Sequence, residues 1–406
     1  MKLMVFEPGF RGHYLQYAGR ILRAAAYPGV DITFVSSAAA VGSEEFRQHI
    51  GSLVPKLDIR APVMHQHEGS VTAFWWQRAR GFVEAVRQVR PDHIIIPYAD
   101  GLIQMLAVQR AMGFGGVLRG IETEAIVLRG SFGYNAQGAA YAKARVSEFL
   151  VARSPVQRLR VLDGVVYDRI KARQWARGKS LLAVPDFCDP LPPMSKAAAR
   201  AALGLGTEGE LVVCAGAMDT RKGFTNLVQA FAAAQAARPG LRLMLAGTFS
   251  PGIADDLRRS FAPLLRTGRL MVTDRFLGER DLNAAVCAAD LVAAAYLNHM
   301  GTSGIVSRAV GNDRPVLTHD RGWCGAMVPQ LQLGMVLDPT DAERYPAKLV
   351  AALDLARQWR PSAAAERLKV FWSPANFDRL CVKRLRERLG LPPEEVVFWE
   401  SVTLDS

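Results

Sequence analysis

A segment in the second half of the chain combines an apolar run, a glycine and two cations. Val212–Ala215 leads into Gly216, and Arg221 and Lys222 precede Gly223 and a predicted helix. Backbone N–H groups at a helix start, together with a fixed ammonium, suit a diphosphate. An ordinary strand-to-helix turn with a solvated Arg-Lys pair fits the same residues, so this segment alone leaves both interpretations open.

A second turn of the same kind follows later in this half. Thr302, Ser303 and Gly304 lie between a predicted strand and a helix, and their N–H and O–H groups are donors for an anion. His299 is a further candidate donor. Arg308, one helical turn past Gly304, is expected at the same end of that helix. The alternative is a tight turn with Arg308 at the surface, but two such turns in one half-chain favour a site.

Short apolar runs alternate with amphipathic ones in the first half of the chain. Such an alternation predicts βαβ units and a doubly wound sheet, because the apolar runs are typical of strands buried on both faces. The predicted strands are Lys2–Glu7, Asp31–Ser36, His93–Pro97, Gly116–Gly120, Leu150–Ala152 and Leu181–Val184, and the helices are His13–Ala26, Val71–Val89, Leu102–Met112 and Ala139–Phe149.

A proline-rich segment, Pro185–Ser195, separates this series from a second one. Each proline fixes its own φ and disfavours helix in the preceding residue, so a domain boundary is expected here. Ligands of doubly wound sheets bind at the carboxyl ends of the strands, where the strand order reverses. Beyond the boundary, strands are predicted at Leu211–Ala215, Arg242–Ala246, Leu270–Thr273, Leu291–Ala294 and Val316–Thr318, and helices at Phe224–Ala237, Ile253–Leu265, Asp281–Ala289 and Gly304–Val310.

The composition fits a globular chain with an anionic partner. Of 406 residues, 50% are hydrophobic and 22% charged, with a formal net charge of +12. A single core rarely reaches this length, so two domains are expected. The excess of cations favours nucleotide phosphates, nucleic acid or an anionic membrane surface.

Neither membrane insertion nor secretion is expected. No apolar run approaches the ~20 residues needed to span a bilayer. The N-terminus has too short an apolar stretch for a signal peptide, so the protein is expected in the cytoplasm. The cysteines are scattered, odd in number and never spaced as C-x-x-C, which predicts reduced thiols without a zinc site: Cys188, Cys214, Cys287, Cys324 and Cys381.

Several segments resemble group 1 glycosyltransferases of the GT-B fold, which use nucleotide-activated sugars. LLAVPDFCDP is similar to that family's linker strand, AGAMDTRKGFTNLVQAF to its lysine-glycine segment, and RFLGERDLNAAVCAADLVAAA to the stretch after it. The resemblance implies an α/β chain of two Rossmann-like doubly wound domains facing a cleft. Residues 1–187 would bind the acceptor, joined by C-terminal helices at about 374–406, and residues 188–373 would bind the nucleotide sugar.

The resemblance also implies roles for donor-binding residues. Lys222 would be the diphosphate lysine and Gly216 the glycine of closest approach. The nucleoside pocket would be lined by the residues from Asp274 to Leu277, including Phe276.

The sequence departs from the family at three positions. The family's arginine after the first glycine is Ala217 here, and its paired glutamates fall on Met300 and Arg308. Two substitutes are hypothesised: Thr302, Ser303 and Arg308 as a group of phosphate donors, and Arg221 for the missing arginine.

Three residues of the first half are candidate catalytic bases. Gly9, Gly12 and His13 form the first strand-to-helix turn, where some resembling enzymes place a histidine as base. A structural or helix-capping His13 is the alternative. Asp100 and Glu122 are predicted to follow later strands, and either would serve if the reaction inverts, although solvated loop carboxylates are more common.

No Asp-x-Asp motif occurs, so no divalent metal is expected. Lys222 and helix N-termini would instead neutralise the departing diphosphate. No cofactor is expected beyond the nucleotide-sugar co-substrate, such as a UDP- or GDP-sugar.

An aromatic and basic stretch lies on the predicted helix Val71–Val89. Trp75, Arg78 and Arg80 on an amphipathic helix suit an anionic bilayer surface, where a lipid-linked acceptor would sit at the inner face of the membrane. A core position for Trp75 and Phe82 with solvated arginines fits equally well. Nucleic acid is not expected, because no recognition signature is present.

The expected function is therefore sugar transfer from a nucleotide-diphosphate donor to a hydroxyl of a saccharide, lipid-linked or small-molecule acceptor. The departures at Ala217, Met300 and Arg308 keep an alternative open, a catalytically silent GT-B protein that binds nucleotide or glycan for regulation or assembly.

Overall fold

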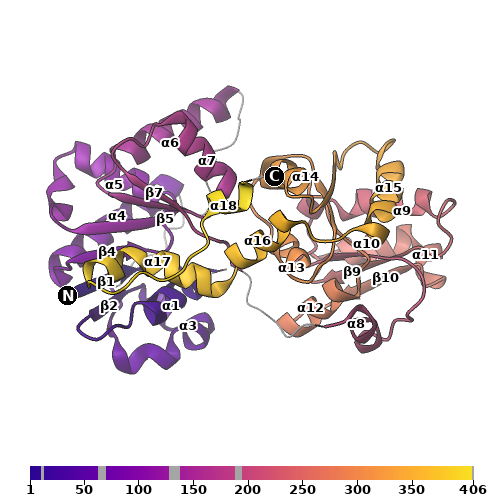
Figure 1. Ribbon diagram of the computed structural model, residues 1–406, viewed down its shortest axis with the longest axis horizontal. Coiled ribbons are helices and arrows are strands. Elements are labelled where there is room, and N and C mark those ends of the chain that lie inside the picture. Colours follow the sequence, from indigo (N-terminus) through magenta and orange to yellow (C-terminus); the bar gives the residue numbers. More distant parts are fainter. Residues whose placement is uncertain (11–12, 63–69, 128–137, 188–193, 405–406) are drawn as a thin grey trace. The chain divides into compact units, whose positions relative to one another are not determined.

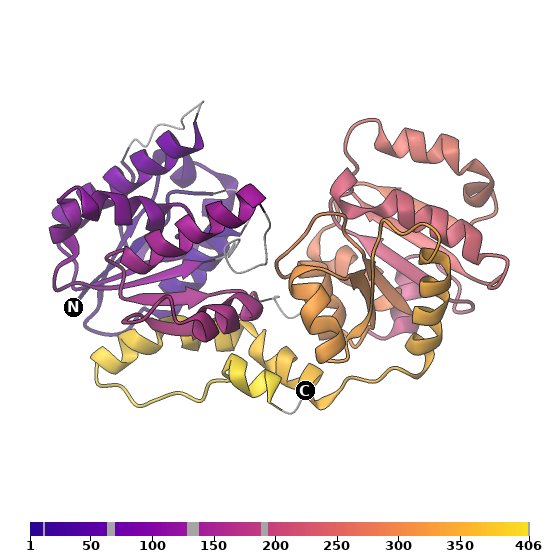
Figure 2. The same ribbon diagram turned by 90° about the horizontal axis from the view of Figure 1, so that it is seen from above.

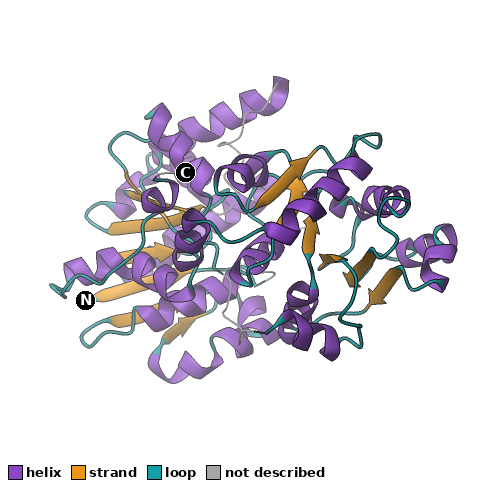
Figure 3. Cartoon of the chain, turned by 45° about the vertical axis from the view of Figure 1, so that its right-hand side comes forward, coloured by secondary structure: helices purple, strands orange, loops and turns teal. Residues whose placement is uncertain are grey.

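The computed structural model describes the chain except residues 11–12, 63–69, 128–137, 188–193 and 405–406. The backbone divides into two compact units (Figure 1). In both units strands alternate with helices along the chain (Figure 3). Unit 1 comprises Met1–Pro185 and Ala375–Val396, and unit 2 comprises Asp186–Pro374 and Val397–Ser406.

Over its described residues, unit 1 is built on a seven-stranded parallel sheet in the order β3-β2-β1-β4-β5-β6-β7. The chain first moves from β1 to β2 and β3, then returns to β4 on the other side of β1, so the strand order reverses between β1 and β4. The strands are β1 (Lys2–Phe6), β2 (Asp31–Val35), β3 (Asp58–Arg60), β4 (His93–Ile96), β5 (Glu122–Val127), β6 (Arg158–Val161) and β7 (Ser180–Ala183).

Helices connect these strands. The first turn leads into an amphipathic helix whose apolar side is buried, and a long helix precedes β4. They are α1 (Tyr14–Ala24), α2 (Ala38–Val41), α3 (Glu44–His49), η1 (Gly51–Lys56), α4 (Val71–Val89), α5 (Leu102–Ala111), η2 (Phe114–Leu118), α6 (Gly138–Arg153) and α7 (Gly164–Arg173). A further helix of this unit, α17 (Pro374–Arg388), comes after all the strands in the chain.

The described part of unit 2 repeats this plan on a six-stranded parallel sheet in the order β10-β9-β8-β11-β12-β13. Here the strand order reverses between β8 and β11. The strands are β8 (Leu211–Ala215), β9 (Arg242–Gly247), β10 (Leu270–Asp274), β11 (Leu291–Ala294), β12 (Val316–His319) and β13 (Gly334–Leu337).

The helices of unit 2 follow the same alternation. They are α8 (Lys196–Ala202), η4 (Thr220–Lys222), α9 (Phe224–Ala234), α10 (Ile253–Ser260), α11 (Ala262–Arg266), α12 (Glu279–Ala288), α13 (Gly304–Gly311), α14 (Gly322–Gln330), α15 (Tyr345–Gln358), α16 (Ala363–Phe371) and α18 (Trp399–Thr403).

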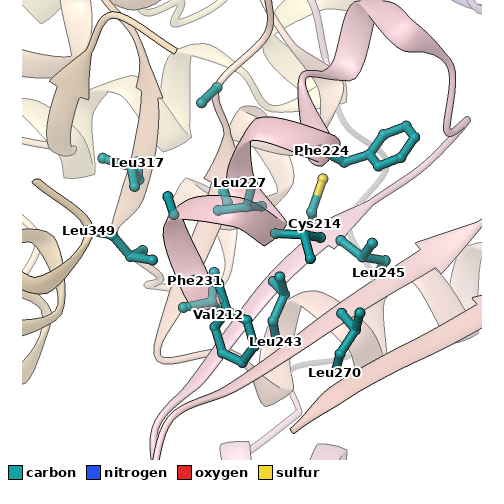
Figure 4. Packing of buried hydrophobic residues seen from close by; sticks show 14 of the residues in the cluster. Val212, Cys214, Phe224, Leu227, Phe231, Leu243, Leu245, Leu270, Leu317 and Leu349 are labelled. Carbon is teal, nitrogen blue, oxygen red and sulfur yellow. The ribbon is translucent and has the colours of Figure 1, made fainter. Parts of the chain in front are cut away.

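The core of unit 2 fixes the position of α9 on the sheet (Figure 4). Val212 and Cys214 are two residues apart on β8 and so lie on one face of the strand, where they share a buried cluster with Leu227 and Phe231 of α9. Those two are four residues apart and lie on one side of the helix. The packing anchors the helix start, and with it the turn that carries Lys222.

The C-terminal segment is divided between the units. The helix α17, yellow in Figures 1 and 2, belongs to unit 1: Arg20 donates two hydrogen bonds to Asp378, at 2.6 and 2.9 Å, and the Phe377 ring lies 5.3 Å from that of Tyr17. The last helix, α18, groups with unit 2, because Trp399 is buried 5.6 Å from the ring of Phe371. Residues Val397–Ser406 therefore depart from the expected return to the first domain.

Most predicted elements form, but the predicted extended stretch Gly116–Gly120 is wrong. Phe114–Leu118 is the 3-10 helix η2, and the strand starts only at Glu122. A 3-10 helix of five residues is too short to show a helical period in the sequence, so nothing there distinguished it from an extended stretch.

The predicted strand Leu150–Ala152 is also wrong. These residues lie inside α6, and the strand that follows is β6. The charges of β6 concealed it, because Arg158 and Arg160 form ion pairs with Glu122 and Glu124 of the neighbouring strand instead of marking a solvated segment.

The described residues also bear on the predictions about membrane-spanning segments and about the cysteines. None of their helices has the length and apolar character required to cross a membrane. Cys188 lies outside the described residues, and the other four cysteines are buried free thiols, as predicted: Cys214, Cys287, Cys324 and Cys381.

Candidate functional site

The ammonium of Lys222 is buried at the point where the strand order of unit 2 reverses. The side chain is 7% exposed, and Nζ donates to the Ala215 carbonyl at 2.7 Å and to the Tyr296 hydroxyl at 3.3 Å. Both acceptors are neutral, and among the described residues no carboxylate lies within ion-pair distance of Nζ. Burial of a charge without a counterion is costly, so this ammonium is poised for an anion.

Glycines allow the backbone to approach Lys222 closely. Gly216 has φ +102°, and a Cβ on it would lie 3.1 Å from Lys222 Nζ. Gly247, at the end of β9, packs so tightly that a Cβ would lie 1.9 Å from the Gly216 carbonyl oxygen. The predicted role of Gly216 as the glycine of closest approach stays a prediction, and its geometry fits that role.

Tyr296, which follows β11, joins the two predicted turns. Its hydroxyl shares a 2.9 Å hydrogen bond with Ser303 Oγ, and its ring centroid lies 4.8 Å from Lys222 Nζ. Ser303 is the N-cap residue of α13, but its side chain caps no N–H group of that helix. Gly304 is exposed at the helix start. The first-turn N–H groups of α13 are therefore left without a side-chain cap from Ser303, as an anion site at a helix start requires.

Two histidines stand beside Tyr296. His299 Nε2 lies 2.8 Å from the Thr302 carbonyl oxygen, and the His319 ring lies 5.9 Å from the His299 ring. Desolvation lowers the pKa of both imidazoles, and the nearby Arg221 and Lys222 lower that of His299 further. His319 Nε2 is buried with no hydrogen-bond partner. Both rings are therefore neutral near pH 7, and His319 is a residue that the sequence did not single out.

Two predicted phosphate ligands are already engaged by other side chains. Thr302 Oγ1 donates to Asp186 at 2.6 Å, and Arg308 Nη2 donates to Glu279 at 2.5 Å. Arg308 is only 7% exposed, so the alternative of a surface arginine is wrong. Its ion pair holds the Glu279 carboxylate at the start of α12.

The remaining donor candidates also lie at the carboxyl ends of the unit 2 strands. Arg221 is half-exposed and pairs with Asp219 at 3.6 Å. Asp274 ends β10 and accepts a hydrogen bond from the Phe249 N–H at 3.1 Å. Of the residues that follow, Leu277 is half-buried and Phe276 is 81% exposed. The structure thus brings these residues to the same sheet edge as Lys222, whereas Arg308 lies in the last turn of α13 and not, as predicted, at its start.

Residues 209–354, which include Lys222 and both turns, match the family model of the group 1 glycosyl transferases. Unit 2 therefore carries a group 1 glycosyltransferase domain. The predicted resemblance and enzyme class are both confirmed by this match. None of the curated proteins compared matches the chain by sequence.

Solved structures extend the likeness in fold to nearly the whole chain. HepE of Anabaena in complex with UDP is 14% identical, covering 96% of this chain and 99% of that one, with a TM-score of 0.64. A glycosyltransferase of Rickettsia africae is 13% identical (96% and 98%, TM-score 0.63), and sucrose-phosphate synthase of Thermosynechococcus elongatus 16% (100% and 96%, TM-score 0.57). The predicted fold class, two Rossmann-like α/β domains of the GT-B type, is confirmed.

In unit 1, two of the three candidate bases lie near the carboxyl ends of strands. His13 is exposed directly before α1, and Nδ1 lies 2.8 Å from Gln16 Oε1. It occupies the N-cap position, but its side chain caps no N–H group. Asp100 follows β4 and is half-buried. Gly12, from the same predicted turn as His13, lies outside the described residues.

Glu122 does not end a strand, and the predicted position is wrong. It is the first residue of β5, paired in register with His93 at the start of β4, on the opposite edge of the sheet from Asp100. It forms ion pairs with Arg158 and, at 3.4 Å, with Arg384. Although partial burial opposes it, these two arginines lower the pKa of Glu122. Glu122 therefore ties β6 and α17 to the sheet and is no candidate base.

The structure adds Glu7, which the sequence analysis did not select. It follows β1 directly and is fully buried; Oε1 accepts a hydrogen bond from the Gly9 N–H at 2.8 Å, while Oε2 has no partner. Burial raises the pKa of Glu7 to about 8, against the lowering effects of the Gly9 hydrogen bond and of Arg78. The available signal was a charged residue at the end of an apolar strand, directly before Pro8 and Gly9.

The aromatic and basic residues of α4 divide between core and surface. Phe82 is fully buried in the core, as one of the two interpretations predicted. Arg80 and Arg87 are exposed and help to line a pocket of about 840 Å³ along this helix, together with Trp76 and Gln109.

Proposed function

We propose that this glycosyltransferase moves a sugar from a nucleotide-diphosphate donor to an acceptor hydroxyl, with the donor on unit 2 and no divalent metal. The buried ammonium of Lys222, which has only neutral partners, is the observation that carries the proposal. A diphosphate supplies the missing negative charge. The acceptor is a saccharide, lipid-linked or small-molecule alcohol bound by unit 1.

The chemistry follows from where charge develops. The bond between the anomeric carbon and the diphosphate oxygen breaks, and its electron pair stays on the diphosphate. Lys222 and the N–H groups at the start of α13 stabilise that charge in place of a metal ion. The acceptor oxygen bonds to the anomeric carbon and releases its proton to a base, for which His13 and Asp100 remain the candidates.

A uridine diphosphate sugar is the first donor to try. The HepE structures hold UDP, UDP with glucose, or UDP-glucose. In this chain, exposed Phe276 and half-buried Leu277 follow β10 at the same sheet edge as Lys222 and give a base an apolar surface. The carboxylate of Asp274 is engaged by the Phe249 N–H, so the proposal assigns it to shaping this loop.

The decisive experiment is a binding screen of the full chain by thermal shift against UDP, GDP, ADP, CDP and TDP. Lys222→Met keeps the length and apolar stem of the side chain but removes its charge, and affinity for the preferred diphosphate is expected to fall at least tenfold. Lys348→Met, at an exposed position on α15 of the same unit, is the matched control and should bind as the wild type does. Unchanged binding by Lys222→Met would contradict the proposal.

Metal independence is tested separately. Across the described residues, no three His, Cys, Asp or Glu side chains are grouped to hold a metal ion. Sugar transfer should therefore persist at full rate in excess chelator, whereas its abolition and recovery with Mg²⁺ or Mn²⁺ would show that Lys222 is insufficient.

A second function, nucleotide binding without transfer, is favoured by one observation. Met300 and Arg308 occupy the positions of the family's paired glutamates, and Arg308 is committed to Glu279. Incubation with a panel of nucleotide sugars distinguishes the two functions. Slow release of the free sugar supports an enzyme, and tight binding without turnover, even with acceptor extracts, supports the silent protein.

We also propose a peripheral position at the cytoplasmic face of the membrane. Exposed Arg80 and Arg87 on α4 support attraction to anionic lipid. Co-sedimentation with phosphatidylglycerol vesicles, but not with phosphatidylcholine vesicles, is expected, and loss of the difference in an Arg80→Gln, Arg87→Gln variant would support it. Equal sedimentation with both lipids would contradict it.

A further inference from the structure

Two imidazoles lie beside the candidate diphosphate site of unit 2, against the ring of Tyr296. The centroid of that ring lies 5.1 Å from that of His299 and 5.6 Å from that of His319, and the two imidazoles are 5.9 Å apart. The same tyrosine ring lies 4.8 Å from Lys222 Nζ. Side chains from η4, from β12 and from the segment after β11 are therefore packed around one tyrosine.

Hydrogen bonds to carbonyl groups determine which nitrogen of each imidazole carries a proton. His299 Nε2 lies 2.8 Å from the Thr302 carbonyl oxygen, and His319 Nδ1 lies 3.3 Å from the Ala294 carbonyl oxygen. A carbonyl oxygen can only accept, so these two nitrogens carry the protons of the neutral rings. His299 Nδ1 makes no hydrogen bond to another described residue, and His319 Nε2 is buried without a partner. Each ring therefore keeps one nitrogen whose lone pair is unused.

Neighbouring cations hold His299 in its neutral form. Burial lowers the pKa of both imidazoles, and Arg221 and Lys222 lower that of His299 further, against the raising effect of the Thr302 carbonyl. An anion bound at Lys222 would reverse this balance, because it offsets the repulsion from the two cations and itself favours the protonated ring. The charge of this histidine is therefore sensitive to a bound diphosphate.

Carboxylates of the protein do not take the place of that anion. Within the described ranges, neither imidazole has a carboxylate within ion-pair distance. Asp320 follows His319 directly and raises the pKa of that ring, but less than burial lowers it. The carboxylates on the segments around the two rings already face other side chains: Asp186 accepts from Thr302 at 2.6 Å, Asp219 pairs with Arg221 at 3.6 Å, and Asp320 pairs with Arg321 at 3.6 Å.

The proposed donor carries more negative charge than Lys222 balances. Each of the two phosphates in a nucleotide sugar holds one negative charge, and Lys222 supplies one positive charge. The arginines nearby face carboxylates, since Arg221 pairs with Asp219 and Arg308 with Glu279. When the bond to the sugar breaks, the diphosphate gains a further negative charge. A second cation that forms only on binding matches this demand.

We propose that His299 takes up a proton when the diphosphate of the donor binds, and so becomes the second cation beside Lys222. The proton comes from solvent and is held by the lone pair of Nδ1, while Nε2–H keeps its bond to the Thr302 carbonyl. His319 stays neutral, because two imidazolium rings 5.9 Å apart would repel each other. This inference rests on the proposed function and adds proton-dependent control of donor binding.

Calorimetry of the full chain counts the protons directly. The ligand is the nucleotide sugar that binds most tightly in the panel, with UDP-glucose tried first, because the end phosphate of free UDP itself titrates near neutral pH. Binding enthalpies are measured at pH 6.5 in PIPES, bis-Tris and imidazole buffers, whose ionisation enthalpies differ, and the slope gives the protons taken up per bound ligand. About 0.3 proton or more is expected for the wild type. Binding without proton uptake would overturn the proposal.

His299→Gln separates the proton from the hydrogen bond. Glutamine keeps an N–H for the Thr302 carbonyl but has no nitrogen that titrates, so proton uptake should fall by at least half. His49→Gln, at the end of α3 in unit 1, is the matched control and should take up as many protons as the wild type. Unchanged uptake in His299→Gln would show that another group holds the proton.

The pH dependence of affinity is a second measurement, which needs only the wild type. The bound protein holds more protons than the free protein, so binding should tighten by about threefold between pH 8 and pH 6. A wild type that binds the nucleotide sugar equally at both pH values contradicts this inference and leaves the proposed function intact. A wild type that binds no nucleotide at either pH contradicts the proposed function itself.

Discussion

The two units share one topology but differ at the point where their strand order reverses. In unit 2, the reversal between β8 and β11 carries a buried ammonium, a tyrosine and two neutral histidines. In unit 1, the reversal between β1 and β4 carries a buried carboxyl group, three aromatic rings and a single arginine.

The difference shows that one topology places chemically different side chains at equivalent points. Ligands of doubly wound sheets bind where the strand order reverses. On our proposal, the buried ammonium of unit 2, which has only neutral partners, binds a phosphate there. Four predictions test this comparison.

The largest effect is expected from Gly247→Ala. A Cβ there would overlap the Gly216 carbonyl oxygen, so the substitution should destabilise the fold by about 3 kcal/mol or more and remove nucleotide binding. Gly304→Ala, where no atom lies within 4 Å of the added Cβ, is the control and should change stability by under about 0.5 kcal/mol. Thermal unfolding measures both. A stable Gly247→Ala protein that binds nucleotide would show that the close approach to Gly216 is dispensable.

The next effect concerns the carboxyl group of unit 1. The pKa of Glu7 is raised from 4.5 to about 8, so the folded state holds a proton that the unfolded state has released over that range. Its contribution to stability is present below about pH 4.5 and is lost as the pH rises through 8, by a few kcal/mol at most. Glu7→Gln carries no such proton, so its stability relative to the wild type should increase between pH 5 and pH 8 in urea titrations. A constant difference across that range would show that Glu7 is ionised in the folded protein.

Ionic strength tests the charge at the unit 2 reversal with a smaller effect. Binding of a diphosphate to Lys222 pairs opposite charges and should weaken several-fold between 0.05 and 0.5 M salt. Calorimetric titrations of the wild type and of Lys222→Met at the two salt concentrations measure this dependence. An equal salt dependence of the two proteins would show that the ammonium does not contribute to it.

The smallest effect is expected from Glu279→Gln. Its carboxylate is 66% exposed, but the Arg308 side chain that it pairs with is only 8% exposed. The Gln oxygen can still accept a hydrogen bond from Arg308, so only the charge is lost, and a destabilisation of about 1 kcal/mol is expected in chemical denaturation. A tenfold loss of nucleotide affinity without a loss of stability would show that Glu279 takes part in donor binding and is not only a structural partner of Arg308.

The sequence located the unit 2 site well because its parts are local. Gly216, Lys222 and the start of α9 belong to one strand, one turn and one helix, so their order along the chain implies their arrangement. Ser303 and Gly304 follow the neighbouring strand and reach the same edge for the same reason. The hydrogen-bond partners of Thr302 and Arg308 could not be predicted from the sequence, because Asp186 and Glu279 come from distant segments.

Unit 1 was harder to predict because its charged residues pair across strands. Glu122 on β5 and Arg158 on β6 form an ion pair. In the sequence, each of these charged residues looks like a solvated loop residue, so neither strand was predicted correctly. Glu7 was overlooked for the opposite reason: its carboxyl group is fully buried, and the burial of a single carboxyl group cannot be read from its neighbours in the chain.

By itself, the sequence determined the alternation of strands and helices, the boundary between the two series, and the family to which unit 2 belongs. These depend on periodicity and on motifs within single βα units. Only the tertiary structure decided which edge of a sheet each charged residue occupies and whether its charge is paired. That decision rests on strand register and burial, which are set by contacts between segments far apart in the chain.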